Sequence, residues 1–203
     1  MASVIPPVSD IAFSPSVKRI QSALGSRAFY QDKPWRDRIT PDIAAFIAER
    51  TSFYLATASA EGQPYIQHRG APKGFLHVID DKTLAFADFV GNRQYITTGN
   101  LAENPKAYIF LMDYENRARV KLWGHAEVND DKTLLAELMP DGYRAKGQQV
   151  VIFKLEALDT NCSQHIPMKF DGGDVAAAFD HLKARIAELE AEVASLKNGQ
   201  ANS

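Results

Sequence analysis

The sequence contains only one cysteine, Cys162, among 203 residues. A single cysteine excludes an intramolecular disulfide and is typical of a reducing compartment. The formal net charge is −2, so the overall charge does not favour nucleic acid or an anionic membrane surface. No apolar run reaches the ~18 residues of a membrane span, and the N-terminus lacks the basic and apolar regions of a signal peptide. We therefore expect a cytoplasmic protein that binds neither nucleic acid nor membrane.

Several motifs of catalysis are also missing from the sequence. It contains no G-x-G-x-x-G after a strand, no Walker A sequence and no G-x-S-x-G elbow. The five histidines show no H-E-x-x-H spacing. Cys162 and His165 form a single C-x-x-H with no second pair, so we expect no metal site.

The first part of the chain shows helix signals. Ser14 is a suitable N-cap and Pro15 a suitable first residue for a helix over residues 14–29. A second start signal at Thr40 precedes a short helix whose buried face would hold Ile43, Phe46 and Ile47. We assign residues 1–39 to an N-terminal helical extension.

Strand signals dominate residues 40–170, which we assign to one domain. The predicted strands lie at residues 52–59, 64–69, 74–79, 83–88, 106–113, 117–129 and 149–159. Helical segments are predicted near residues 92–102 and 130–138. Because short hairpin connections join most of the strands, we expect a mainly β, antiparallel, closed or partly closed barrel with flanking helices.

Residues 171–203 differ in pattern, with apolar residues spaced alternately four and three apart over about three heptads. The apolar positions are 175, 179, 182, 186, 189, 193 and 196. Branched residues at a and leucine at d favour a parallel two-stranded coiled coil, in which Arg185 faces Glu190 and Glu192 faces Lys197 of a partner. The alternative is an amphipathic helix that packs on its own barrel.

Cations and aromatic residues gather near several predicted strands. Arg117, Arg119, Lys121, Trp123 and His125 alternate onto one strand face, which could instead be an ordinary solvated face.

A second group of cations lies at strand ends. Asn92 and Arg93 come at the start of a helix-like segment, where backbone N–H groups bind phosphate, although they could also be a simple cap and a surface cation. Arg69 and Lys73 form a further strand-end cluster. The aromatic residues between these clusters are Phe75, Phe86, Phe89 and Trp123. Together these residues indicate a flat aromatic ligand that bears a phosphate.

From about residue 40 to residue 170 the sequence resembles the pyridoxamine 5'-phosphate oxidase-like family of flavin-binding split barrels. The segments that carry the resemblance are "EGQPYIQHRG", "TLAFADFVGNRQ", "NLAENPKAYIFLMD" and "VKLWGHAEV". "NCSQHIP" resembles a C-P-Q-H-I-P box of one branch, with Ser163 in place of the proline. The resemblance implies an FMN-binding split barrel that forms a homodimer with FMN at the subunit interface.

The resemblance also implies site residues. Gln67 and Arg69 match a strand that contacts the cofactor, and Asp88 matches a position near the flavin ring. Asn92 and Arg93 match the phosphate motif, in which Gln94 replaces a lysine whose charge Lys73 or His68 would supply. Arg119 matches a residue that reaches the ring from the second subunit. Gln164 and His165 belong to the C-terminal box.

The resemblance implies a flavin-dependent oxidoreductase that acts on a small conjugated or heterocyclic substrate. The catalytic residue is not identified, and His165 is the candidate proton donor. A C-terminal Trp- and Arg-containing segment typical of true pyridoxamine phosphate oxidases is missing, so vitamin B6 oxidation is not predicted. The alternatives are a non-catalytic barrel that binds or senses flavin or haem, and a purely structural dimer.

Overall fold

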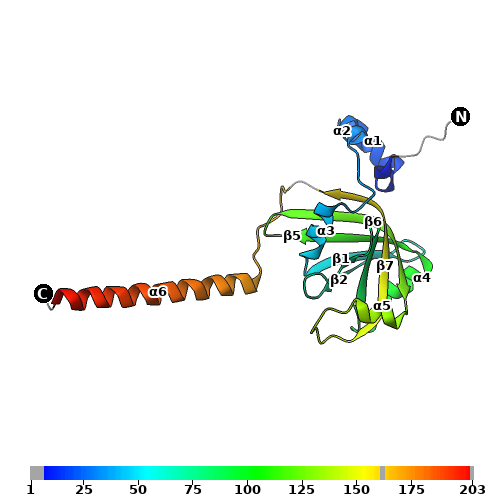
Figure 1. Cartoon of the computed structure of the whole chain (residues 1–203). Helices are drawn as coiled ribbons and strands as arrows, with labels where there is room; N and C mark the ends of the chain where they lie inside the picture. The colour runs from blue at the N-terminus through cyan, green and yellow to red at the C-terminus, as the bar shows by residue number, and fades with distance from the viewer. Residues whose placement is uncertain (1–6, 161–162, 202–203) are drawn as a thin grey trace. The chain divides into compact units, whose positions relative to one another are not determined.

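The computed structural model describes residues 7–160 and 163–201 (Figure 1). The chain divides into two compact units, each of which is described by itself. The first comprises Met1–Asp113 with Ala118–Gln164, and the second comprises Tyr114–Arg117 with His165–Ser203. The N-terminal helices thus belong to the same unit as the strands. Cys162, on which the predictions about disulfides and the C-x-x-H pair rest, lies outside the described residues.

The first unit is built around one seven-stranded sheet, in the order β2-β1-β5-β6-β7-β4-β3. All of its paired strands are antiparallel. The strands are β1 (Ser52–Ala58), β2 (Pro64–Gly70), β3 (His77–Val78), β4 (Thr83–Phe89), β5 (Lys106–Asp113), β6 (Ala118–Asn129) and β7 (Gly147–Thr160).

The sheet curls so that strands near its opposite ends share one core. Phe53 of β1 meets Phe86 of β4 with ring centroids 5.1 Å apart, and it stacks on Phe75 at 5.4 Å. All three rings are almost fully buried. The predicted antiparallel split barrel is therefore confirmed.

The predicted third strand is mostly not a strand. Over residues 74–79 only His77 and Val78 pair with β4. Gly74 has a φ of 83°, which glycine adopts readily, and the chain after it places Phe75 and Leu76 in the core without regular pairing. Burial rather than sheet pairing therefore accounts for the apolar character of this segment.

The predicted helix over residues 14–29 is interrupted. It forms α1 (Pro15–Ala23) and α2 (Arg27–Asp32), which follow a short 3₁₀ turn, η1 (Val8–Ile11). Gly25, with a φ of 78°, separates the two helices. Ser14 does cap α1, since its hydroxyl accepts from the Val17 N–H at 3.3 Å.

The helix predicted after Thr40 is present as α3 (Pro41–Ala48). Its residues Ile43 and Ile47 are buried in the core of the barrel, as the apolar spacing predicts. Two further helices, α4 (Ile96–Glu103) and α5 (Lys132–Glu137), lie close to the predicted segments. The Asp131 side chain caps α5 by accepting from the N–H groups of Thr133 and Leu134.

The N-terminal segment is attached to the outer face of β6 and β7. Trp35 packs against Trp123 with ring centroids 4.8 Å apart, and Phe13 packs on Trp35 at 5.2 Å. The Leu158 N–H donates to the Arg36 carbonyl at 2.8 Å. These contacts anchor the end of the extension next to the barrel.

In the second unit, α6 (Gly172–Ala201) is a single long helix, and the helix predicted for this region is confirmed. Its pairing with another helix stays a prediction. None of the helices within residues 7–160 and 163–201 combines the length and apolarity needed to cross a bilayer.

Candidate functional site

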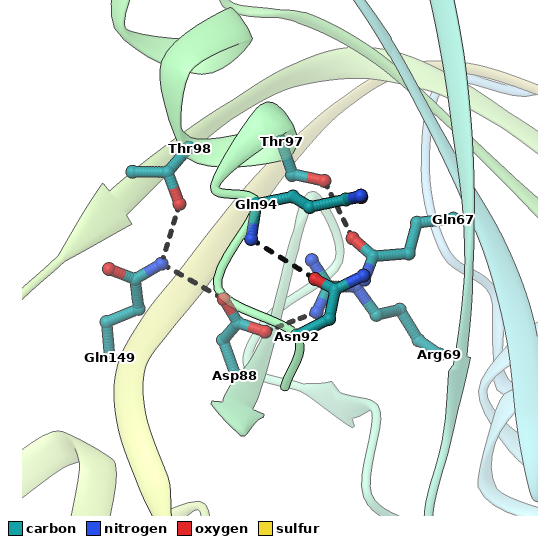
Figure 2. A network of polar contacts seen from close by, with 8 residues as sticks. All are labelled: Gln67, Arg69, Asp88, Asn92, Gln94, Thr97, Thr98 and Gln149. Atoms are coloured by element: carbon teal, nitrogen blue, oxygen red, sulfur yellow. Dashed lines mark hydrogen bonds and ion pairs between the residues drawn. The ribbon is translucent and has the colours of Figure 1, made fainter. Parts of the chain in front are cut away.

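Gln67 and Arg69 lie on the core side of β2 because of the strand register. They stand opposite Leu55 and Phe53 of β1, which are both buried. Since β2 is at the edge of the sheet, these two polar side chains reach the rim of the barrel. Figure 2 shows them pointing toward Asp88 and the chain that follows β4.

A buried ion pair joins Arg69 of β2 to Asp88 of β4. The two side chains are only 13% and 11% exposed. The second Asp88 oxygen accepts from the Gln149 amide at 3.0 Å, and the same amide donates to the Thr98 hydroxyl at 3.0 Å (Figure 2). The pair thus links both ends of the curled sheet to the start of α4.

Arg69 retains an unused donor within this network. Its Nε atom is buried and has no hydrogen-bond partner within residues 7–160 and 163–201. A buried N–H without an acceptor is costly, so a ligand oxygen at this position would stabilise the site.

The segment between β4 and α4 is a tight polar turn. Arg93 and Tyr95 have φ values of 60° and 55°, in the left-handed region that such residues rarely adopt. The Asn92 side chain accepts from the Gln94 N–H at 3.2 Å. The helix begins only at Ile96, so the prediction that Asn92 and Arg93 start it is wrong. Both residues precede the helix because the left-handed residues interrupt helical geometry.

These elements surround an open hollow at the barrel rim. Its lining is mainly polar, and its cavity volume is about 50 Å³. The lining residues are Tyr65, Gln67, Arg69, Asp88, Phe89, Gly91, Asn92, Arg93, Gln94, Tyr95, Ile96, Thr97, Thr98 and Gln148. Thr97 and Gln67 are joined across it by a hydrogen bond of 2.9 Å.

Six of the predicted cofactor-binding residues therefore come together, namely Gln67, Arg69, Asp88, Asn92, Arg93 and Gln94. Their roles toward a cofactor stay predictions. His68 points to the other face of β2, where it contacts Tyr54 with ring centroids 5.5 Å apart. Lys73 forms an exposed ion pair with Glu49 at 2.9 Å. Neither lines the hollow.

Arg119 lies on the outer face of β6, since its neighbour Val120 is buried in the core. Its Nε atom is buried without a hydrogen-bond partner in the described part of the chain. Burial, together with the Asp159 carboxylate, raises the pKa of nearby Tyr108 to about 12, while the Arg119 guanidinium acts in the opposite direction. Arg117, predicted on the same strand face, instead belongs to the turn before β6 and has a φ of 50°.

Gln164 and His165 of the predicted C-terminal box are both exposed. His165 has a φ of 61° and belongs to the second unit. The proposed roles of these two residues stay predictions.

Three of the four aromatic residues expected to interleave with the cations do so in a neighbouring hollow of about 120 Å³, which Phe75, Phe86 and Phe89 line together with His68, Arg69 and Asp88. The Arg69 guanidinium there lies 5.8 Å from the centroid of the Phe86 ring. Phe75 and Phe86 fill the barrel core, and Trp123 is covered by Trp35. Of the four predicted aromatic residues only Phe89 also lines the rim hollow that contains Arg93. The other rings in that hollow are Tyr65 and Tyr95. Strand alternation could have found Tyr65, which lies two residues before Gln67 on the same face.

Comparison with known proteins agrees with this architecture. Residues 39–162 match the family model described as pyridoxamine 5'-phosphate oxidase. The structure of HupZ from Group A Streptococcus has 21% sequence identity and a TM-score of 0.51, covering 65% of this chain and 99% of HupZ. An FMN-binding protein from Syntrophomonas wolfei has 13% identity and a TM-score of 0.46, covering 71% of this chain and 97% of that protein. At 21% identity the HupZ structure supports the fold alone.

A search of the curated proteins found no match to this chain. The family match ends at residue 162, so it does not test the box around His165. It nevertheless spans more than half of the chain and includes both strands that carry the Arg69–Asp88 pair. The chain therefore belongs to the pyridoxamine 5'-phosphate oxidase family.

Proposed function

We propose that this protein binds FMN at the barrel rim, as a homodimer, and acts as a flavin-dependent oxidoreductase on a small conjugated or heterocyclic substrate. The observation that carries the proposal is the charge of the hollow. Arg69 is neutralised by Asp88, whereas Arg93 has no ion-pair partner among the described residues. The lining thus offers one uncompensated cation to an anionic ligand.

The residues present fit a flavin phosphate. Arg93 supplies the charge, and the polar turn around it exposes residues 91–96 to solvent. The buried Arg69 Nε supplies a donor that has no acceptor among the residues that the structure describes. Charge-assisted hydrogen bonds to phosphate are among the stronger polar contacts in proteins.

The size of the hollow supports a site completed by a second copy of the chain. Its cavity volume of about 50 Å³ is far below the ~300 Å³ or more of pockets that enclose small organic ligands. A neighbouring hollow of about 400 Å³ shares Arg93, Tyr95 and Gln148 with it, and both hollows are open to solvent. One chain therefore offers a wall for the ligand rather than an enclosure. A second barrel against this rim would supply the opposite wall.

A bound flavin would supply hydride chemistry, and the chain would supply binding and electrostatics. Gln67, Asp88 and Thr97 form a polar wall that can orient a heterocyclic ring by hydrogen bonds. The proton donor is not assigned, and His165 stays the candidate that the sequence suggests. The family name and the hollow together support this activity over a structural role.

We expect Arg93→Ala to weaken FMN binding by about tenfold or more, because hydrogen bonds to charged groups contribute roughly 1.5–3 kcal/mol. Quenching of flavin fluorescence during titration of the ligand-free protein measures this. Arg38→Ala is the matched control, since Arg38 is 60% exposed, pairs with Asp81 and does not line the hollow. Equal FMN affinity of Arg93→Ala and the wild type would contradict the proposed site.

Arg119→Gln tests the proposed contribution of the second subunit. A fixed positive charge near the ring favours its reduced, more negative state, so losing it should lower the flavin midpoint potential by some tens of millivolts. Affinity for FMN should change little, because Arg119 does not line the hollow that holds the proposed phosphate-binding residue Arg93. Spectroelectrochemical titration decides the matter, and an unchanged potential would remove Arg119 from the site. A shifted potential without turnover of any reductant would favour a flavin-binding, non-catalytic barrel.

A further inference from the structure

One face of α6 is apolar along its whole described length. We call it the α6 seam: Val175, Phe179, Leu182, Ile186, Leu189, Val193 and Leu196. Each of these side chains is between 38% and 62% exposed. A monomeric soluble protein rarely leaves so long an apolar stripe in water, so the seam needs a partner.

The spacing within the α6 seam identifies the kind of partner. Successive members are alternately four and three residues apart, which is the heptad repeat of a coiled coil and narrower than the face of a helix that packs on a barrel. We propose that α6 pairs with α6 of a second copy of this chain as a parallel two-stranded coiled coil. The proposal rests on the helix alone and is independent of the flavin site.

Charge complementarity supports a second copy as the partner. With Val175 at d, Arg185 and Glu192 occupy g positions, and Glu190 and Lys197 occupy e positions. In a parallel pair Arg185 faces Glu190 of the other helix and Glu192 faces Lys197, so both contacts attract. The helix is thus complementary to itself.

The same charges would also attract in an antiparallel pair, where Arg185 would face Glu192 and Lys183 would face Glu190. The apolar residues distinguish the parallel from the antiparallel arrangement. Ile186 and Val193 at a are β-branched, while Leu182, Leu189 and Leu196 occupy d. This distribution is the one that favours two parallel strands.

The start of the α6 seam has room for a partner side chain. Phe170, Val175, Phe179 and Leu182 border an open hollow of about 300 Å³ with almost no polar surface. In a parallel pair the Phe179 rings of the two chains come together at this level. A phenylalanine ring at heptad position a needs such space beside it, and the hollow supplies that space.

Disulfide trapping in the full chain tests the pairing. In a Cys162→Ser background, Leu182→Cys places a thiol at d, and Ala184→Cys places one at the outward f position of the same helix. Because a disulfide needs close Cβ atoms, we expect Leu182→Cys to cross-link at least about tenfold faster. Equal rates at the two positions would overturn the parallel coiled coil.

A charge exchange tests the orientation. Arg185→Glu should slow cross-linking through Leu182→Cys, because two carboxylates then face each other at each g–e contact. Adding Glu190→Arg should restore the rate if the helices are parallel. In an antiparallel pair with Arg185 facing Glu192, the two Leu182 positions would lie roughly 15–20 Å apart along the axis, out of reach of a disulfide. A double variant that stays as slow as Arg185→Glu would therefore overturn the parallel arrangement.

Discussion

Asp88→Ala is expected to lower the free energy of unfolding by about 3–5 kcal/mol, the usual cost of leaving one member of a buried ion pair unmatched. The Arg69 side chain, which is 13% exposed in the wild type, would be left with no carboxylate beside it. The amide of Gln149 would lose the same partner. We also expect FMN affinity to fall, since the Arg69 side chain would no longer be fixed at the rim. Urea unfolding of the ligand-free protein and flavin titration measure the two effects.

Asp113→Ala provides the matched control for this substitution. Asp113 pairs with Arg50 at 3.0 Å, and the two side chains are 8% and 15% exposed, so the burial is closely similar. Neither residue lines the rim hollow. Asp113→Ala should therefore cost a comparable amount of stability while FMN affinity is retained. If Asp88→Ala kept its FMN affinity as well, the Arg69–Asp88 pair would be structural only.

Among glycine-to-alanine substitutions in the barrel, we expect Gly124→Ala to be the most destabilising. A Cβ atom at this position would lie 2.0 Å from the Lys154 carbonyl oxygen and 3.0 Å from the Phe153 ring. The β6–β7 register shifts between Trp123 and Gly124, so the backbones approach unusually closely there. Backbone atoms cannot move aside as a flexible side chain can. We therefore expect the free energy of unfolding to fall by at least about 3 kcal/mol. Thermal and urea unfolding measure it.

Gly99→Ala is the comparison for Gly124→Ala. Gly99 lies within α4, and a Cβ atom there would meet nothing within 4 Å. Alanine is a better helix former than glycine, so the free energy of unfolding of this variant should rise by roughly 0.5–1 kcal/mol. A tolerated Gly124→Ala would mean that β6 and β7 can separate at the bulge without loss of the barrel.

The strands were predictable because alternation is a local property of the sequence. Val120 and Leu122 face the core and Lys121 does not, as the pattern of β6 predicts. Regular pairing was overestimated where burial alone makes a segment apolar, as at Phe75, and at Arg117, which lies in the turn before β6. Gly25 could have indicated the break between α1 and α2, since glycine is common after a helix C-terminus.

The site was predictable in part, because several of its residues lie in short segments that resemble the family. The ion pair and hydrogen bonds within the site were not predictable. Asp88 pairs with Arg69 across the curled sheet and with Gln149 through the β4–β7 register, and both depend on long-range pairing. The sequence therefore indicates Arg69 as a cation free to bind phosphate, whereas the structure shows that Asp88 already neutralises it.

The contact between Trp35 and Trp123 has a consequence for spectroscopy. The sequence contains two tryptophans, and both are in this one pair at the junction of the N-terminal segment and the outer face of β6. Intrinsic tryptophan emission is therefore a local reporter of whether that segment is docked. Detachment of the segment would change the emission while the far-ultraviolet signal of the barrel stayed constant. The two optical signals together separate release of the extension from unfolding of the sheet.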